Sequence, residues 1–132
     1  MKWLNRPLKV GKLRVSTMDL VSSVAAALGY GGWAVFVNYE VSPMSGWRAG
    51  CVQGSYAFCS TLFLTIAIRK IYYLGGSGKR GRLIAFAVGI VIIISLPATL
   101  NLIAQTPNVI MTILPGILIG SVYVGMFAYL LE

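Results

Sequence analysis

Four long apolar stretches, separated by short polar or charged segments, make up most of the chain. Each is close to the roughly 20 residues that an α-helix needs to cross the hydrocarbon core of a bilayer. We therefore expect membrane-spanning helices at residues 17–38, 49–70, 83–103 and 108–131. Because the first and third connections are short, consecutive helices should pack as an antiparallel up-down bundle. The predicted fold is a single all-α integral membrane domain over residues 1–132.

The second predicted span carries small and polar residues on one side. At about 100° per residue, Gly50, Gln53, Gly54, Ala57 and Thr61 share a face, which Leu64 continues. The hydrophobic effect does not drive helices together in lipid. Close backbone approach and hydrogen bonds between helices must therefore hold them together. This face should therefore contact protein, and the small face of the first span is its expected partner. The predicted helix-packing residues are Gly29, Gly50, Gly54, Ala57, Gly116 and Gly120.

Basic residues fall almost entirely on one side of the predicted bundle. Ten of the eleven lie in an arm at residues 1–15 or between Arg69 and Arg82, beside a predicted loop at 71–82. The positive-inside rule then places both termini in the cytoplasm, and short loops favour a bacterial inner membrane. The charges either set orientation alone or also bind anionic lipid headgroups. The predicted headgroup contacts are Lys9, Lys12, Arg14, Arg69, Lys70, Lys79, Arg80 and Arg82.

Composition excludes most enzymes. The chain has three acidic residues, no histidine and 11% charged residues, against about a quarter in soluble domains. Catalytic triads and zinc sites lack their bases and ligands. Asp19 and Glu40 belong to opposite membrane faces, so they cannot work as a pair, and Asp19 is expected to stabilise a helix N-terminus. We expect no catalytic site, metal, cofactor or nucleic-acid partner.

Polar residues near the first and third connections are the candidate substrate-binding group. Polar side chains inside a membrane are costly and often functional. The alternative is that each one ends a helix or meets headgroups, and Thr106 with Pro107 is expected to begin the fourth helix. The candidate residues are Glu40, Arg48, Gln53, Asn101 and Gln105.

Two functional classes remain. The size and number of helices resemble those of small multidrug transporters and small polyprenol-lipid flippases. However, the first span lacks the central acidic residue that small multidrug transporters use for proton exchange, and no flippase motif is present. Because buried charge usually marks a coupled transporter, we expect a noncatalytic accessory or assembly subunit, either a homo-oligomer or docked on a larger membrane protein. The alternative is a small oligomeric transporter or flippase for a lipid-like or amphipathic substrate.

Overall fold

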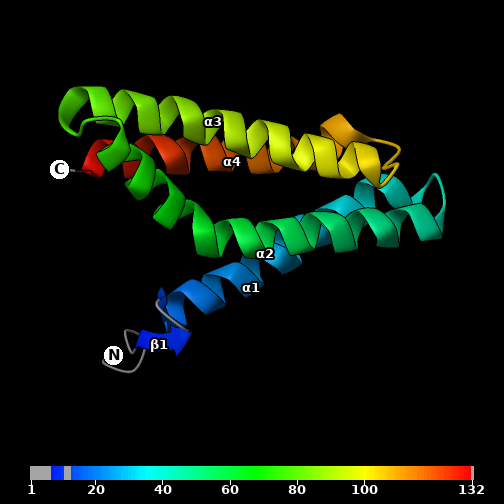
Figure 1. Cartoon of the computed structure of the whole chain (residues 1–132). Coiled ribbons are helices and arrows are strands. Elements are labelled where there is room, and N and C mark those ends of the chain that lie inside the picture. The colour runs from blue at the N-terminus through cyan, green and yellow to red at the C-terminus, as the bar shows by residue number, and fades with distance from the viewer. Residues whose placement is uncertain (1–6, 11–12, 132) are drawn as a thin grey trace.

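The computed structural model describes residues 7–10 and 13–131, and four helices make up most of it (Figure 1). They are α1 (Thr17–Tyr39), α2 (Pro43–Leu74), α3 (Gly78–Ile103) and α4 (Val109–Leu130). Each helix is long and apolar enough to cross a membrane. The prediction of four helices of membrane-spanning length is therefore confirmed, and it indicates an integral membrane protein.

Part of the predicted basic arm forms a short hairpin before α1. Strand β1 (Pro7–Val10) pairs antiparallel with β2 (Leu13–Ser16), and Lys9 lies opposite Arg14 in the register. Strand β2 leads directly into α1. The predicted headgroup contact at Lys12 lies outside the described residues.

The second helix begins earlier than the sequence pattern predicts. We expect residue 49 from hydropathy, whereas α2 begins at Pro43 and leaves only residues 40–42 as a connection. The hydroxyl of Ser42 accepts a hydrogen bond from the N–H of Ser45 at 3.0 Å, and Pro43 occupies the first turn. Both are favourable helix-start features, so local capping outweighs the polar composition of this segment.

The prediction of a basic loop at residues 71–82 is wrong. Helix α2 continues to Leu74 and α3 begins at Gly78, so the connection is residues 75–77. This turn needs positive φ angles at Gly76 (94°), Ser77 (58°) and Gly78 (55°), and the Tyr72 hydroxyl accepts a hydrogen bond from the N–H of Gly78 at 3.1 Å. Glycine adopts such angles without strain, which permits so tight a turn. The basic residues on either side therefore lie on ordered helix ends.

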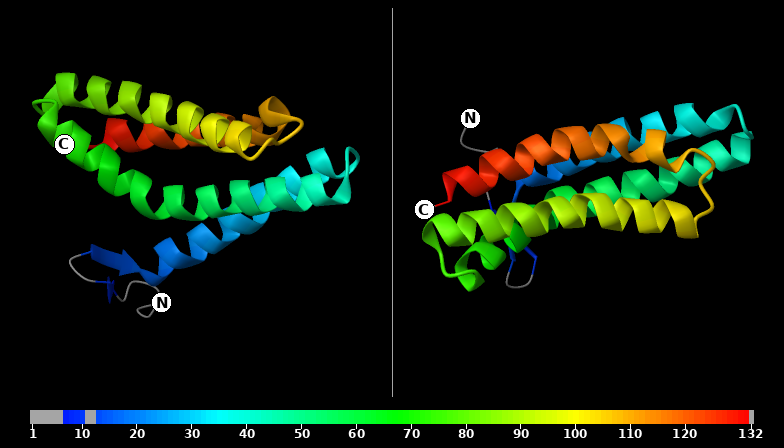
Figure 2. Two further views of the ribbon diagram at one scale, coloured as in Figure 1. Left: turned by 45° about the vertical axis from the view of Figure 1, so that its right-hand side comes forward. Right: turned by 90° about the horizontal axis from the view of Figure 1, so that it is seen from above.

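The connections divide between two ends of the molecule. The α1–α2 and α3–α4 connections lie together at one end, which we call the connection end (Figure 1). The hairpin, the α2–α3 turn and the C-terminus lie at the other, the hairpin end, and the further views agree (Figure 2).

Helix α2 changes partners along its length. Near the connection end it lies against α1, where Gly50 and Gly54 meet Gly31. Towards the hairpin end, Ile68 and Tyr72 instead belong to a core with residues of α3 and α4. Helix α1 is consequently separated from α2 near the hairpin (Figure 1). This divergence opens space between α1 and the other helices.

Close packing between α1 and α2 depends on Gly31. A Cβ atom added there would lie 3.0 Å from the carbonyl oxygen of Gly50 and 3.3 Å from the Cα of Gly54. Added to Gly29 or Gly32, it would meet no atom within 4 Å. One or two residues rotate a position by about 100° or 200° around a helix, which turns these glycines away from α2. The packing glycine of α1 is thus Gly31, and the sequence-based choice of Gly29 is corrected.

Candidate functional site

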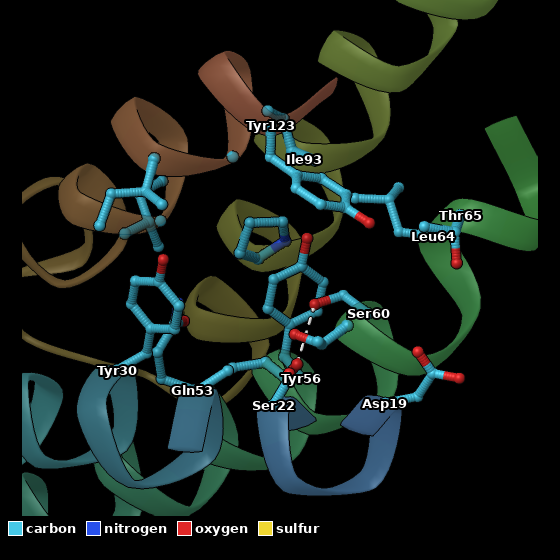
Figure 3. Close-up of a pocket in the computed structure, with 18 residues that line it drawn as sticks. Asp19, Ser22, Tyr30, Gln53, Tyr56, Ser60, Leu64, Thr65, Ile93 and Tyr123 are labelled. Carbon is cyan, nitrogen blue, oxygen red and sulfur yellow. Dashed lines mark hydrogen bonds between the residues drawn. The ribbon is translucent and has the colours of Figure 1, made fainter. Parts of the chain in front are cut away.

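A cavity of about 290 Å³ lies among the four helices, in the space opened by the divergence of α1 (Figure 3). Every helix contributes to its lining. It reaches from Asp19, in the first turn of α1, to Tyr30 and Gln53, which lie deeper in the bundle. Gly116 and Gly120 of α4 also line it. The predicted small faces of α2 and α4 therefore border a cavity over part of their length.

One face of α2 forms a polar wall of this cavity. Gln53, Tyr56, Ser60, Thr61 and Thr65 recur at helical spacing and all line it. From first to last they span twelve residues, or about 18 Å along the helix. The face predicted from the sequence thus packs against α1 at its glycines and lines the cavity further along.

Asp19 is the only charged side chain among the described residues of the lining. The other polar groups are the Gln53 amide and several hydroxyls, including those of Ser22, Tyr30 and Tyr123. Apolar side chains such as Leu64 and Ile93 complete the wall (Figure 3). Ligand sites are commonly apolar with a few placed polar groups. The lining is therefore suited to a molecule with both polar and apolar parts.

Gln53 ends a chain of buried hydrogen bonds. The Thr106 hydroxyl donates to Asn101 Oδ1 at 2.9 Å, and Asn101 Nδ2 donates to Gln53 Oε1 at 2.9 Å. Asn101 Nδ2 also donates to the carbonyl of Pro97 at 2.9 Å. All three polar side chains are buried, with Gln53 only 1% exposed. These bonds join α2 to the end of α3 and fix the orientation of the Gln53 amide.

A second buried group joins α1 to α4 near the connection end. Asn38 Nδ2 donates to the Thr112 hydroxyl oxygen at 2.7 Å, and Asn38 Oδ1 accepts from the N–H of Asn108 at 2.9 Å. The Thr112 hydroxyl in turn donates to the Asn108 carbonyl at 2.7 Å. The two groups of bonds thus join α1 to α4 and α2 to α3 at one end of the cavity. We call the six residues the polar cluster: Asn38, Gln53, Asn101, Thr106, Asn108 and Thr112.

Trp33 adds a further link between α1 and α4. Pro115 has no N–H, so the Met111 carbonyl, four residues earlier, loses its helical partner. The Trp33 indole N–H donates to this carbonyl at 2.8 Å. A freed backbone group inside a membrane must be satisfied in some such way. The proline of α4 therefore creates a binding point for α1.

The sequence-predicted substrate residues divide into three groups. Gln53 and Asn101 contact each other, and only Gln53 lines the cavity. Arg48 donates to the Gln105 carbonyl at 3.2 Å, which links the start of α2 to the α3–α4 connection. Glu40 is exposed beside Tyr39 and Phe36 of α1, away from the cavity lining.

Thr106 also differs from its predicted role. It does not begin the fourth helix, because α4 starts at Val109 and the Thr106 hydroxyl is bonded to Asn101.

Two basic side chains near the hairpin end have defined contacts. The Arg69 guanidinium lies 6.0 Å from the ring centre of Phe127. Arg82 Nε donates to the Leu131 carbonyl at 2.8 Å, and its guanidinium lies 5.9 Å from the Tyr129 ring centre. Neither arginine lines the cavity.

No known protein family, characterised protein or solved structure matches this chain. Function must therefore be argued from the site itself. Within residues 7–10 and 13–131, no group of three or more His, Cys, Asp or Glu side chains is placed to hold a metal ion. Cys51 and Cys59 are free, exposed and outside the lining of the cavity.

Sequence reasoning missed Asp19, Tyr30, Tyr56 and Tyr123 as site residues. The sequence offers another explanation for each of them: Asp19 lies where a helix starts, and the tyrosines lie within amphipathic spans. A signal was present in α2, where hydroxyl residues continue the face of Gln53 for three further turns. Such a face indicates polar contacts, but only the divergence of α1 shows that it borders a cavity.

Proposed function

We propose that this protein binds an amphipathic, lipid-like molecule within the membrane and moves it between leaflets. The observation that carries the proposal is the cavity of about 290 Å³, lined by all four helices and bearing polar groups inside a largely apolar bundle. Polar side chains that face a cavity within the membrane usually mark a substrate path. The polar cluster would close one end of that path while the separation of α1 leaves the other accessible.

The proposed orientation follows from charge. In an antiparallel up-down bundle with both termini cytoplasmic, the hairpin end faces the cytoplasm and the connection end faces outward. Arg69, Lys70, Lys79, Arg80 and Arg82 then lie at the cytoplasmic surface of a bacterial inner membrane, where they attract anionic headgroups. Lys9 and Arg14 of the hairpin would add to this effect. The cavity would accordingly load from the inner leaflet.

Single cysteines test this orientation in a chain carrying Cys51→Ser and Cys59→Ser. Ser77→Cys places a thiol in the α2–α3 turn, and Met44→Cys places one at the exposed start of α2. In intact cells, a membrane-impermeant maleimide should label residue 44 and spare residue 77. The reverse pattern would invert the topology.

Filling the cavity tests the function. Gly116 lines the cavity, and a Cβ atom there would approach nothing closer than 3.7 Å, so Gly116→Ile should fold and occupy the space. Gly125→Ile is the matched control, because Gly125 lies on the same helix against the Phe86 side chain. The three proteins are extracted with surrounding lipid, and the retained molecules are identified by mass spectrometry.

We expect one amphipathic molecule to be retained by the wild type and by Gly125→Ile and lost from Gly116→Ile. The same molecule in reconstituted vesicles should then change leaflet faster with wild-type protein than with Gly116→Ile. Identical retained molecules in all three proteins would refute the proposal.

The accessory-subunit function is the second candidate. It is favoured by a shallow groove on the α1–α2 pair, lined by small residues that include Ala27, Cys51 and Ser55. Because Gly54 also packs against α1, replacing it would disturb the fold itself. Ser55 is exposed, so Ser55→Leu should fill the groove without disturbing the packing of α1 on α2. Ser95→Leu, at an exposed position of α3, is the control. Loss of a co-purifying protein, or of a second copy, from Ser55→Leu alone would support docking.

A further inference from the structure

The buried amide of Gln53 presents its nitrogen to the cavity. A glutamine amide has one oxygen acceptor and one NH₂ donor group. Here the oxygen is already bonded to Asn101 Nδ2, whose own orientation is fixed because its oxygen accepts from Thr106. The chain of bonds thus runs in one direction and leaves Gln53 Nε2 as its free end.

Nothing in the described part of the protein accepts a hydrogen bond from this nitrogen. Every completely buried side-chain nitrogen or oxygen there has a hydrogen-bond partner. Because Nε2 has none, it is not completely buried and is accessible from the cavity that Gln53 lines. Gly116 lies opposite, and a Cβ atom on it would be 3.7 Å from Nε2. The missing side chain at Gly116 therefore leaves room for an acceptor to approach. Since a donor without an acceptor is unfavourable in low dielectric, a molecule that supplies one is favoured.

The charge of the lining restricts what that acceptor can be. Asp19 is negative, and neither lysine nor arginine is found among the described lining residues. Arg69 and Arg82 contact aromatic rings and a backbone carbonyl elsewhere. A phosphate or carboxylate in the cavity would have no countercharge, which is costly in a membrane. An uncharged carbonyl, ether or hydroxyl oxygen has no such cost.

We propose that Gln53 determines specificity by donating a hydrogen bond to an uncharged oxygen of the bound amphiphile. Asn101 and Thr106 act through Gln53 as positioning residues. This inference rests on the proposed function, because it concerns the occupant of the same cavity.

Protection of a cysteine in the cavity wall tests the inference. Ser60 lines the cavity, so Ser60→Cys is made with Cys51→Ser and Cys59→Ser, and the full chain is placed in phospholipid nanodiscs. The rate of reaction with N-ethylmaleimide is measured against the concentration of three probes of similar length. N,N-dimethyldecanamide has an uncharged acceptor, dodecane has none, and decyl phosphate is an anion. As a control, a second variant keeps Ser60 and Cys59 and carries only Cys51→Ser, so that its reaction reports a cysteine outside the cavity.

We expect the amide to protect residue 60 at about tenfold lower concentration than dodecane or decyl phosphate, and to leave Cys59 unprotected. Gln53→Met keeps the length of the side chain but removes the donor, and it should abolish the preference for the amide over dodecane. A purely structural effect would change protection by both probes together. Asn101→Leu, which retains Gln53 but removes its orienting partner, should reduce the preference partially.

Three other outcomes would contradict the inference. An unchanged preference for the amide in Gln53→Met would overturn the role of Gln53 while leaving the occupied cavity intact. Equal protection by decyl phosphate and the amide would overturn the selection for an uncharged group. Failure of all three probes to protect residue 60 would overturn both this inference and the proposed function.

Discussion

Two adjacent glycines of α1 provide a sharp test of the packing. Gly31→Ala places a methyl group 3.0 Å from the Gly50 carbonyl oxygen and 3.3 Å from the Gly54 Cα, both of them backbone atoms. Gly32→Ala places the same group where no atom lies within 4 Å. Since the chemical change and the helix are the same, the two variants differ only in what the methyl group meets.

The expected magnitude follows from that difference. Alanine is about 0.8–1.0 kcal/mol more favourable than glycine within a helix, and both variants gain this. The methyl of Gly31→Ala is a few tenths of an ångström too close to α2, so the helices must separate and lose contacts along their interface. Such overpacking costs about 1–3 kcal/mol. Gly31→Ala should therefore have a free energy of unfolding about 1–3 kcal/mol below that of Gly32→Ala.

Titration with sodium dodecyl sulfate in phospholipid–detergent micelles, followed by circular dichroism, measures both free energies. Gly32→Ala should equal or exceed the wild type. Equal free energies for the two variants would refute close packing of α1 on α2 at Gly31.

Three further predictions concern the connection end. In a double-mutant cycle of Gln53→Leu and Asn101→Leu, the coupling energy should be about 0.6–1.7 kcal/mol, the range of hydrogen bonds between membrane helices; zero coupling would show that the bond is not made. Gln105 has a φ of 55°, so Gln105→Gly should raise the free energy of unfolding by about 0.5–1 kcal/mol, and a decrease would contradict this geometry. Because Glu40 lies outside the cavity, Glu40→Gln should leave the retained amphiphile unchanged by mass spectrometry. Its loss would instead place the binding site at the connection end.

Much of the helical fold could be predicted because membrane spans are set by local composition. Twenty apolar residues in a row have few alternatives in lipid, and the 3.6-residue period places Gly50, Gln53, Gly54 and Ala57 on one buried face of α2. The helix ends were less predictable. The α2–α3 turn requires a left-handed conformation at Ser77, a residue that gives no strong signal for it.

The cavity could not be predicted, because a small polar face is compatible with either close packing or an open space. The outcome depends on where α2 leaves α1. That point is set by contacts distant in sequence, in which Ile68 and Tyr72 join the core with Ala85 and Val124. Asp19 illustrates the same limit, since its place at a helix start is correct and yet does not reveal that it lines a cavity.

The proline of α4 determines which part of the bundle resists movement. If α1 swung away from α4 at Trp33, the Met111 carbonyl would be left without a donor in hydrocarbon, at a cost of several kcal/mol. Nearer the hairpin, α1 diverges from α2, which there packs with α3 and α4 (Figure 1). Any rocking of α1 should thus pivot about Trp33 and have its largest amplitude at the hairpin end. Because Pro115 lacks an N–H, the sequence of α4 would in this way set the position about which α1 turns.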